Sequence, residues 1–162
     1  MKAMILYHGS NLEIKQPSLQ YSRSSLDFGS GFYTTTDLQQ AKKWANRVVH
    51  LRKTGEPTVS VFETDDALWN SLLTLCFESA DSAWLQTVVA YRRLQPPDIQ
   101  ADVISGPIAD DRTVDVINQY IAGTYPEHIA LELLLPMRFQ DQWALKTEKA
   151  LAAVAWKETI KV

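Results

Sequence analysis

Cysteine is nearly absent from this chain: Cys76 is the only one among 162 residues. A single thiol excludes an intrachain disulfide and any zinc site built from cysteines. Cys76 lies in the apolar run Leu72–Phe77, so we expect a buried, unreactive side chain. No metal site is expected either, because His50 and His128 have no carboxylate or cysteine company that suggests one.

Long apolar runs and an excess of one charge are also missing. The most apolar stretch, Ile129–Met137, is interrupted by Glu132 and Pro136 and falls short of the roughly 18 uncharged residues of a membrane helix. The N-terminus does not read as a signal peptide, so we expect a cytoplasmic protein with no membrane partner. Sixteen Lys and Arg residues against 19 Asp and Glu argue against a general nucleic-acid binder.

The composition that is present fits one folded domain. Hydrophobic residues make up 46% and charged residues 22% of the sequence, as in an average soluble protein. No linker or repeat divides the chain, so one domain over residues 1–162 is expected. Periodicity predicts strands over 5–7, 31–35, 58–62, 72–77, 101–104, 142–147 and 156–162, and helices over 36–52, 81–95, 113–122, 124–135 and 148–153. Because strands and helices do not alternate strictly, the prediction is an α+β fold.

Polar residues mark where several of these helices should begin. Thr36 and Thr124 are each followed three residues later by Gln or Glu, the capping-box pattern. Asp81 and Thr147 stand directly before apolar helical periodicity and are expected to act as N-caps. Gly123 is placed to end the helix that precedes it.

Two short motifs stand out from this background. Tyr7-His8-Gly9-Ser10 puts an imidazole and bare backbone at the end of a predicted strand. The segment Asp27–Thr35 contains Gly29 and Gly31 before an aromatic pair. Because neighbouring strand residues face opposite sides, one aromatic ring can enter the core while the other faces a cleft and stacks on a flat ligand. Taken singly, the motifs also fit a strand end turning into a loop and a core aromatic pair after a glycine turn.

Taken together, His8-Gly9-Ser10 and Phe28-Gly29-Ser30-Gly31-Phe32-Tyr33 resemble the ADP-ribosyltransferase superfamily, in its His-Tyr branch typified by poly-ADP-ribose polymerases. The resemblance implies a split pair of antiparallel-rich sheets with flanking helices and with NAD, the co-substrate, in the cleft between them. It implies that the histidine and the glycine backbone hold the adenine ribose and the nicotinamide amide, and that the tyrosine stacks on nicotinamide. The NAD contacts implied are His8, Gly9, Ser10, Gly31 and Tyr33.

The likeness extends over nearly the whole chain to an uncharacterised bacterial family within that superfamily. The matching pieces are Leu6–Ser10, Asp27–Thr35, Ala83–Leu85, Tyr91–Arg93, Gly106–Arg112 and Gln142–Leu151. Members of that family are regarded as candidate toxins of toxin–antitoxin pairs. The resemblance therefore implies a small antitoxin protein as a partner.

The third catalytic position departs from the polymerase pattern. A glutamate opens the last core strand there, whereas the corresponding strand here begins with Gln142. An amide stabilises a developing positive charge less well than a carboxylate does. Asp110 and Asp111 are the best substitute carboxylates, or they serve as a turn and cap before the next helix. Glu148, about 20 Å further along extended chain, is read as structural.

Further residues complete the expected site. Gln140 resembles the residue that addresses the acceptor in other transferases, while Asp141 alternates to the opposite face from Gln142. Arg23 could pair with the NAD diphosphate or be a solvated loop arginine. We expect His8, Tyr33 and Gln142 to converge on one pocket.

The function implied is transfer of ADP-ribose from NAD to an unknown macromolecular acceptor, protein or nucleic acid. Two alternatives stay open. One is an NAD glycohydrolase, which needs no acceptor besides water. The other is a catalytically weak or inactive module that binds NAD, another nucleotide or a partner.

Overall fold

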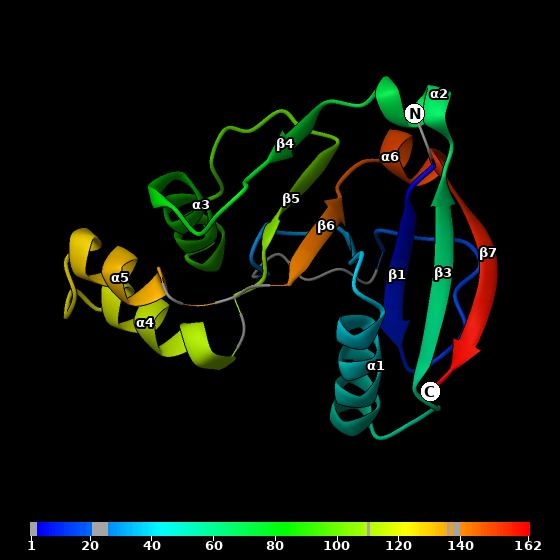
Figure 1. Cartoon of the computed structure of the whole chain (residues 1–162), viewed down its shortest axis with the longest axis horizontal. Coiled ribbons are helices and arrows are strands. Elements are labelled where there is room, and N and C mark those ends of the chain that lie inside the picture. The colour runs from blue at the N-terminus through cyan, green and yellow to red at the C-terminus, as the bar shows by residue number, and fades with distance from the viewer. Residues whose placement is uncertain (1–2, 21–25, 110, 136, 138–139) are drawn as a thin grey trace.

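The computed structural model describes residues 3–20, 26–109, 111–135, 137 and 140–162, with the side chains of 111 and 112 left aside. The described chain is mixed α+β and contains two sheets (Figure 1). The first sheet has the order β1-β3-β7, with bounds Ile5–Ser10, Thr58–Thr64 and Val154–Lys161. The second has the order β2-β6-β5-β4, with bounds Phe32–Thr34, Asp141–Leu145, Val103–Pro107 and Thr74–Cys76.

The first sheet is antiparallel throughout, and helix α1, Leu38–Arg52, packs on one of its faces (Figure 1). Ala41, Val59 and Val61 form the small core of this contact. The helix comes so close to β1 that a Cβ on Gly9 would lie 2.0 Å from the carbonyl oxygen of Ala41. A side chain at position 9 would therefore displace α1 from the sheet.

The second sheet carries the larger core on the face away from the first sheet. Helix α3, Ser82–Arg92, lays Trp84, Leu85 and Val88 on this face, where Ile104 and Ala144 meet them. Helices α4 and α5, Asp111–Ile121 and Glu127–Leu134, add Ile117 and Leu134 to the same cluster and lie beyond α3 in Figure 1.

A second core fills the space between the two sheets. Leu6 and Phe62 of the first sheet meet Phe32, Val103 and Leu145 of the second. Two short helices, α2 at Asp66–Asn70 and α6 at Glu148–Ala152, lie at one end of the sheets (Figure 1). Strand β2 thus sends Phe32 into this core, whereas Tyr33 packs against the α3 core. The two rings face opposite sides, as expected, but Tyr33 packs against the α3 core where a cleft was expected.

Two of the four expected helix starts are confirmed. Asp81 accepts from the N–H of Trp84 at 2.9 Å, and Thr147 accepts from the N–H of Ala150 at 3.1 Å. Gly123 follows α4 with φ of +81°, the conformation expected of a glycine that ends a helix.

The two capping boxes are wrong. Asp37 caps α1 through the N–H groups of Gln39 and Gln40, because the side chain of Thr36 is bonded to Asp141 of β6 instead. Helix α5 begins after Pro126 with no side-chain cap. Glu127 turns to α3, where it accepts from Ser82 and Gln86. Partners distant in sequence have displaced the local ones.

Cys76 is exposed, which corrects the expectation of a buried thiol. It ends the three-residue strand β4, which stands next to β5 at the edge of the second sheet in the described part of the chain. An edge strand this short is covered on one side only, so apolar neighbours in sequence do not ensure burial.

Glu148 lies in the first turn of α6, where the helix dipole stabilises a negatively charged side chain. Among the described residues, no helix is long and apolar enough to cross a membrane.

Candidate functional site at the seam between the sheets

Among the described residues, an isolated backbone bridge links the two sheets, between β1 and the residue that follows β2. Tyr7 N–H donates to the Thr35 carbonyl at 2.8 Å, and Thr35 N–H donates back to Tyr7 at 2.9 Å. Past this bridge the two strands part. We call this bridge, with the diverging parts of β1 and β2 beside it, the seam. The seam brings together the motif at 7–10 and the motif at 27–35, which is called the glycine motif below.

His8 follows the bridge and is held by β2. Its Nδ1 lies 2.6 Å from the carbonyl oxygen of Tyr33, and its ring stacks on Phe32 with centroids 4.1 Å apart. Because a carbonyl can only accept, Nδ1 carries the proton. Burial lowers the pKa of His8 to about 4; the Tyr33 carbonyl opposes that shift, and the positive charge of Arg52 adds to it. At neutral pH the ring is therefore uncharged, and Nε2 is a hydrogen-bond acceptor.

Gly9 presents main-chain groups to the seam. The pairs of β1 with β3 alternate between hydrogen-bonded and non-bonded, and Tyr7 uses its N–H and C=O toward Thr35. Gly9, two residues later, therefore also directs its N–H and C=O away from β3. Gly9 is buried, yet no hydrogen bond joins these two groups to another described residue. One donor and one acceptor stand side by side at the strand edge.

Tyr33 is fixed by its own hydroxyl. The hydroxyl donates to the carbonyl of Gly29 at 2.7 Å and accepts from the N–H of Phe28 at 2.9 Å. Burial raises the pKa of Tyr33 strongly, the Phe28 N–H opposes this, and the nearby Asp27 carboxylate raises it further. The Tyr33 hydroxyl thus holds the turn at Phe28 and Gly29 against strand β2.

The three residues expected to converge are brought together only in part. His8 touches the main chain of Tyr33, but its ring lies against Phe32, on the face opposite the Tyr33 side chain. Tyr33 pairs with Ala144 of β6, and Gln142, two residues from Ala144, shares its face. Tyr33 and Gln142 therefore lie on one side of the second sheet, while the His8 ring lies on the other.

Gln142 is buried, with 3% of its surface exposed. Its Nε2 donates to the Asp27 carboxylate and to the Pro107 carbonyl, both at 3.1 Å. Both groups are acceptors, which identifies the atom facing them as nitrogen rather than oxygen. The amide of Gln142 therefore has a defined orientation.

Asp27 is the carboxylate at this position, although no site role was predicted for it from the sequence. Its Oδ1 accepts from Nε and an amino nitrogen of Arg92, at 3.1 and 2.7 Å. Its Oδ2 accepts from the N–H of Ala109 at 3.0 Å as well as from Gln142. The signal in the sequence was its place at the head of the glycine motif.

Two of the remaining residues expected to contact NAD, Ser10 and Gly31, are buried. Ser10 is buried and donates to Asn11 at 3.3 Å. Gly31 is buried beside β6, where a Cβ would lie 3.1 Å from the Leu145 carbonyl. Arg23 and Asp110 lie outside the described residues, and Asp111 is described only as the first residue of α4.

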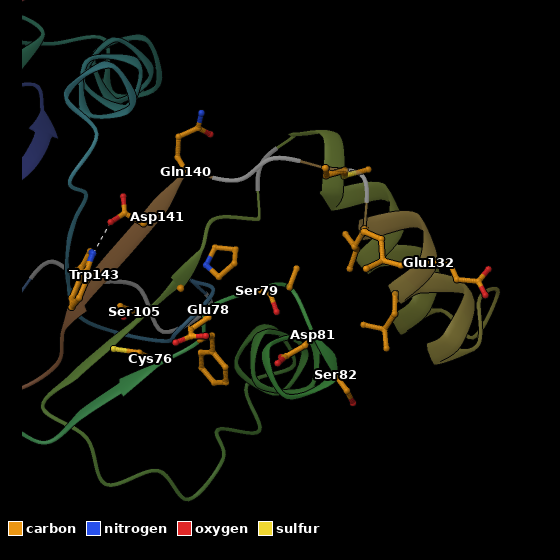
Figure 2. Close-up of a pocket in the computed structure, with 18 of the residues that line it drawn as sticks. Cys76, Glu78, Ser79, Asp81, Ser82, Ser105, Glu132, Gln140, Asp141 and Trp143 are labelled. Carbon is orange, nitrogen blue, oxygen red and sulfur yellow. Dashed lines mark hydrogen bonds between the residues drawn. The ribbon is translucent and has the colours of Figure 1, made fainter.

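A groove of about 850 Å³ opens beside the start of β6, between the segment after β4 and helix α5 (Figure 2). Its wall is mainly apolar, and Gln140 and Asp141 belong to its lining. Asp141 accepts from Trp143 at 2.6 Å and from the hydroxyls of Thr35 and Thr36. As expected, Asp141 and Gln142 face opposite sides of the strand.

Lys146 stabilises the glycine motif from the other end of β6. Its ammonium donates to the carbonyl of Phe28 and lies 4.8 Å from the ring centre of Tyr91. Burial lowers its pKa to about 8. Among the described residues, no group of three or more His, Cys, Asp or Glu side chains could hold a metal ion.

Comparison of the sequence with protein families assigns this two-sheet α+β protein to one of them. Residues 4–156 match the family described as "Protein of unknown function (DUF3990)". The match covers most of the chain, so the protein belongs to that family. No curated protein matches the sequence. The family description assigns no activity to its members.

Proposed function

We propose that this protein is an NAD-dependent ADP-ribosyltransferase. The two motifs that resemble the His-Tyr branch of that superfamily meet at the seam, where His8 is bonded to Tyr33. Two antiparallel-rich sheets part at this place, which fits the split core implied by the resemblance. We propose in addition that the two sheets form an ADP-ribosyltransferase-like core, with NAD bound between them.

One observation carries the proposal: the N–H and C=O that Gly9 directs into the seam. A carboxamide offers one acceptor and two donors, so the nicotinamide amide of NAD would satisfy both groups at once. The neutral His8 ring beside it offers Nε2 to a ribose hydroxyl. These two contacts would hold the dinucleotide along the edge of β1.

The reaction breaks the bond between the nicotinamide nitrogen and C1′ of the ribose. Nicotinamide leaves with the bonding electron pair, and the ribose carries positive charge in the transition state. A nucleophilic atom of the acceptor then forms a bond to C1′ and loses its proton to solvent or to a nearby base. Hydrolysis by water at C1′ gives free ADP-ribose instead, which is the glycohydrolase alternative.

The groove beside β6 is the proposed place for the acceptor. Gln140, Asp141 and Trp143 line it, so a molecule bound there would lie against the strand that carries the third position. The acceptor would be a protein or a nucleic acid. We place the reaction in the cytoplasm, with a small antitoxin protein as a proposed partner.

A binding module without catalysis is the second candidate. The observation in its favour is that both contacts of the Gln142 Nε2 are made within the protein, to Asp27 and Pro107. A neutral, buried amide stabilises positive charge less than an exposed carboxylate would. Such a module would bind NAD at the same seam without breaking it.

Incubation of the purified protein with NAD radiolabelled in the adenylate portion, with and without cell lysate, tests the proposal. A transferase moves the label onto protein or nucleic acid only when lysate is present. Free ADP-ribose in both samples identifies a glycohydrolase. Intact NAD that co-elutes with the protein identifies the binding module, and the absence of both binding and turnover overturns the proposal.

A further inference from the structure

The carboxylate nearest to the third position comes from the loop before β2 rather than from β6. Asp27 is 9% exposed and Gln142 is 3% exposed, and they are hydrogen-bonded at 3.1 Å. The sequence separation is 115 residues, so only the fold brings the two together. The pair stands where the resemblance implies a single glutamate.

Asp27 is held by hydrogen-bond donors from three parts of the chain. The Arg92 guanidinium makes two hydrogen bonds to Oδ1, and Oδ2 accepts from the Ala109 N–H and from Gln142. The guanidinium is always protonated, and it forms an ion pair with Asp27, with 2.7 Å between an amino nitrogen and Oδ1. Four donors to two oxygens also hold the carboxylate at one position and orientation.

Gln142 is polarised by this contact. Its Nε2 donates to a charged acceptor and to the Pro107 carbonyl, and hydrogen bonds in a chain strengthen one another. Electron density shifts toward Oε1, which is the only acceptor atom of the amide. The amide thereby gains part of the character of a carboxylate without carrying a full charge.

We infer that Asp27 supplies the negative charge that the third catalytic position, Gln142, lacks. Asp27 is a positioning residue: it orients and polarises the Gln142 amide, and the amide makes the contact with the substrate. The inference rests on the proposed function and adds one contact to it: Oε1 of Gln142 would accept from the nicotinamide ribose. It also accounts for the glutamine itself. A glutamate at position 142 would face the Asp27 carboxylate and the Pro107 carbonyl, so that like charges would meet in a buried site.

The test is an exchange of the charge between the two positions. Gln142→Glu puts two carboxylates together, Asp27→Asn removes the charge, and the double variant restores one carboxylate and one amide in exchanged places. We expect each single variant to lower the melting temperature by roughly 3–10 °C and the double variant to lose less than the sum. Gln16→Glu, in an exposed loop, is the control for added charge.

The pH dependence separates repulsion from simple misfit. Of the described titratable groups, Arg92 and Tyr33 face Asp27, and Gln142→Glu adds one further carboxyl to this set. The repulsion raises the pKa of the introduced carboxyl in the folded Gln142→Glu protein. The stability deficit of this variant against wild type should therefore shrink as the pH falls from 7 to 4, whereas the double variant should show no such recovery.

Nicotinamide release from NAD gives the functional readout. We expect Asp27→Asn to slow release by about 10²–10³-fold, the effect of one lost electrostatic partner, and the double variant to recover at least tenfold of that loss. Additive melting temperatures, or unchanged release in Asp27→Asn, would overturn the inference. Coupled melting temperatures with no release by any variant, wild type included, would instead overturn the proposed transferase and leave the pair as a structural one.

Discussion

His8 donates from Nδ1 to the carbonyl oxygen of Tyr33 across 2.6 Å, and this hydrogen bond joins the two motifs of the chain. It also determines the tautomer of the imidazole, because the carbonyl accepts from the proton-bearing nitrogen. The Nε2 atom is left as an acceptor at neutral pH. The relationship between these two residues therefore defines both the geometry of the seam and its chemistry.

The lowered pKa of His8 predicts that the protein loses stability in mild acid. The unfolded histidine takes up a proton near pH 6.5, whereas the folded one resists protonation down to about 4. The unfolded state thus binds more protons between these values, so the free energy of unfolding falls as the pH drops through this window. The loss should reach about 3 kcal/mol at most, measured by urea denaturation from pH 7.5 to 4.

The variant His8→Gln isolates this effect from other titrating groups. It should remove most of the slope between pH 6.5 and 4, and His128→Gln, at an exposed position, should keep it. Identical slopes in His8→Gln and wild type would show that the ring is not held neutral by the fold.

Tyr33→Phe should weaken the glycine motif even though the ring is kept. The substitution leaves the N–H of Phe28 and the carbonyl of Gly29 without their hydroxyl partner, at a cost of about 1–3 kcal/mol. Amide hydrogen exchange at Phe28 should become faster by at least tenfold. Tyr7→Phe is the control, since its hydroxyl makes no hydrogen bond to another described residue, and unchanged exchange in Tyr33→Phe would contradict the bond.

Gly9→Ala should separate helix α1 from β1. The new Cβ would lie 2.0 Å from the Ala41 carbonyl and 2.8 Å from the Ala45 nitrogen, both rigid backbone atoms. We expect a loss of about 1–3 kcal/mol or more in thermal unfolding. Gly123→Ala meets no atom within 4 Å and should lose only about 1–2 kcal/mol through its positive φ; equal losses would argue against close packing at Gly9.

The exposed thiol offers a direct test of the groove as the acceptor site. Cys76 is the only cysteine and lines the groove, so a bulky maleimide should label the native protein at a single position. The label should abolish transfer to the acceptor while leaving nicotinamide release within about twofold, because the seam lies on other strands. Cys76→Ser, treated identically, is the control. Equal loss of both activities would place the acceptor elsewhere.

Much of the fold could be predicted from local patterns. The strand at Ile5, the helix after Asp81 and the helix after Thr147 are confirmed because their determinants lie within a few neighbouring residues. Thr36 and Thr124 fit the same local rules and are wrong. Thr36 is bonded to Asp141 instead, and Glu127, the expected partner of Thr124, is bonded to helix α3.

The candidate site could likewise be predicted only where local motifs determine it. His8, Tyr33 and Gln142 could be singled out from motifs along the chain, but which face each side chain takes depends on how β1, β2 and β6 are paired. Only its place at the head of the glycine motif pointed to Asp27, since its four donors come from α3, β6 and the segment after β5. Cys76 was misjudged because an edge strand leaves one side open.

Titration of isotope-labelled protein with NAD, followed through its backbone amide NMR signals, tests the central claim most directly. The account predicts that NAD shifts the amide signals of His8, Gly9 and Tyr33. The analogue whose nicotinamide carboxamide is replaced by a carboxylate should bind at least about tenfold more weakly, because it lacks the donor for the Gly9 carbonyl. Equal affinity for the two compounds, or shifts confined to the groove beside β6, would contradict the assignment of the seam as the NAD site.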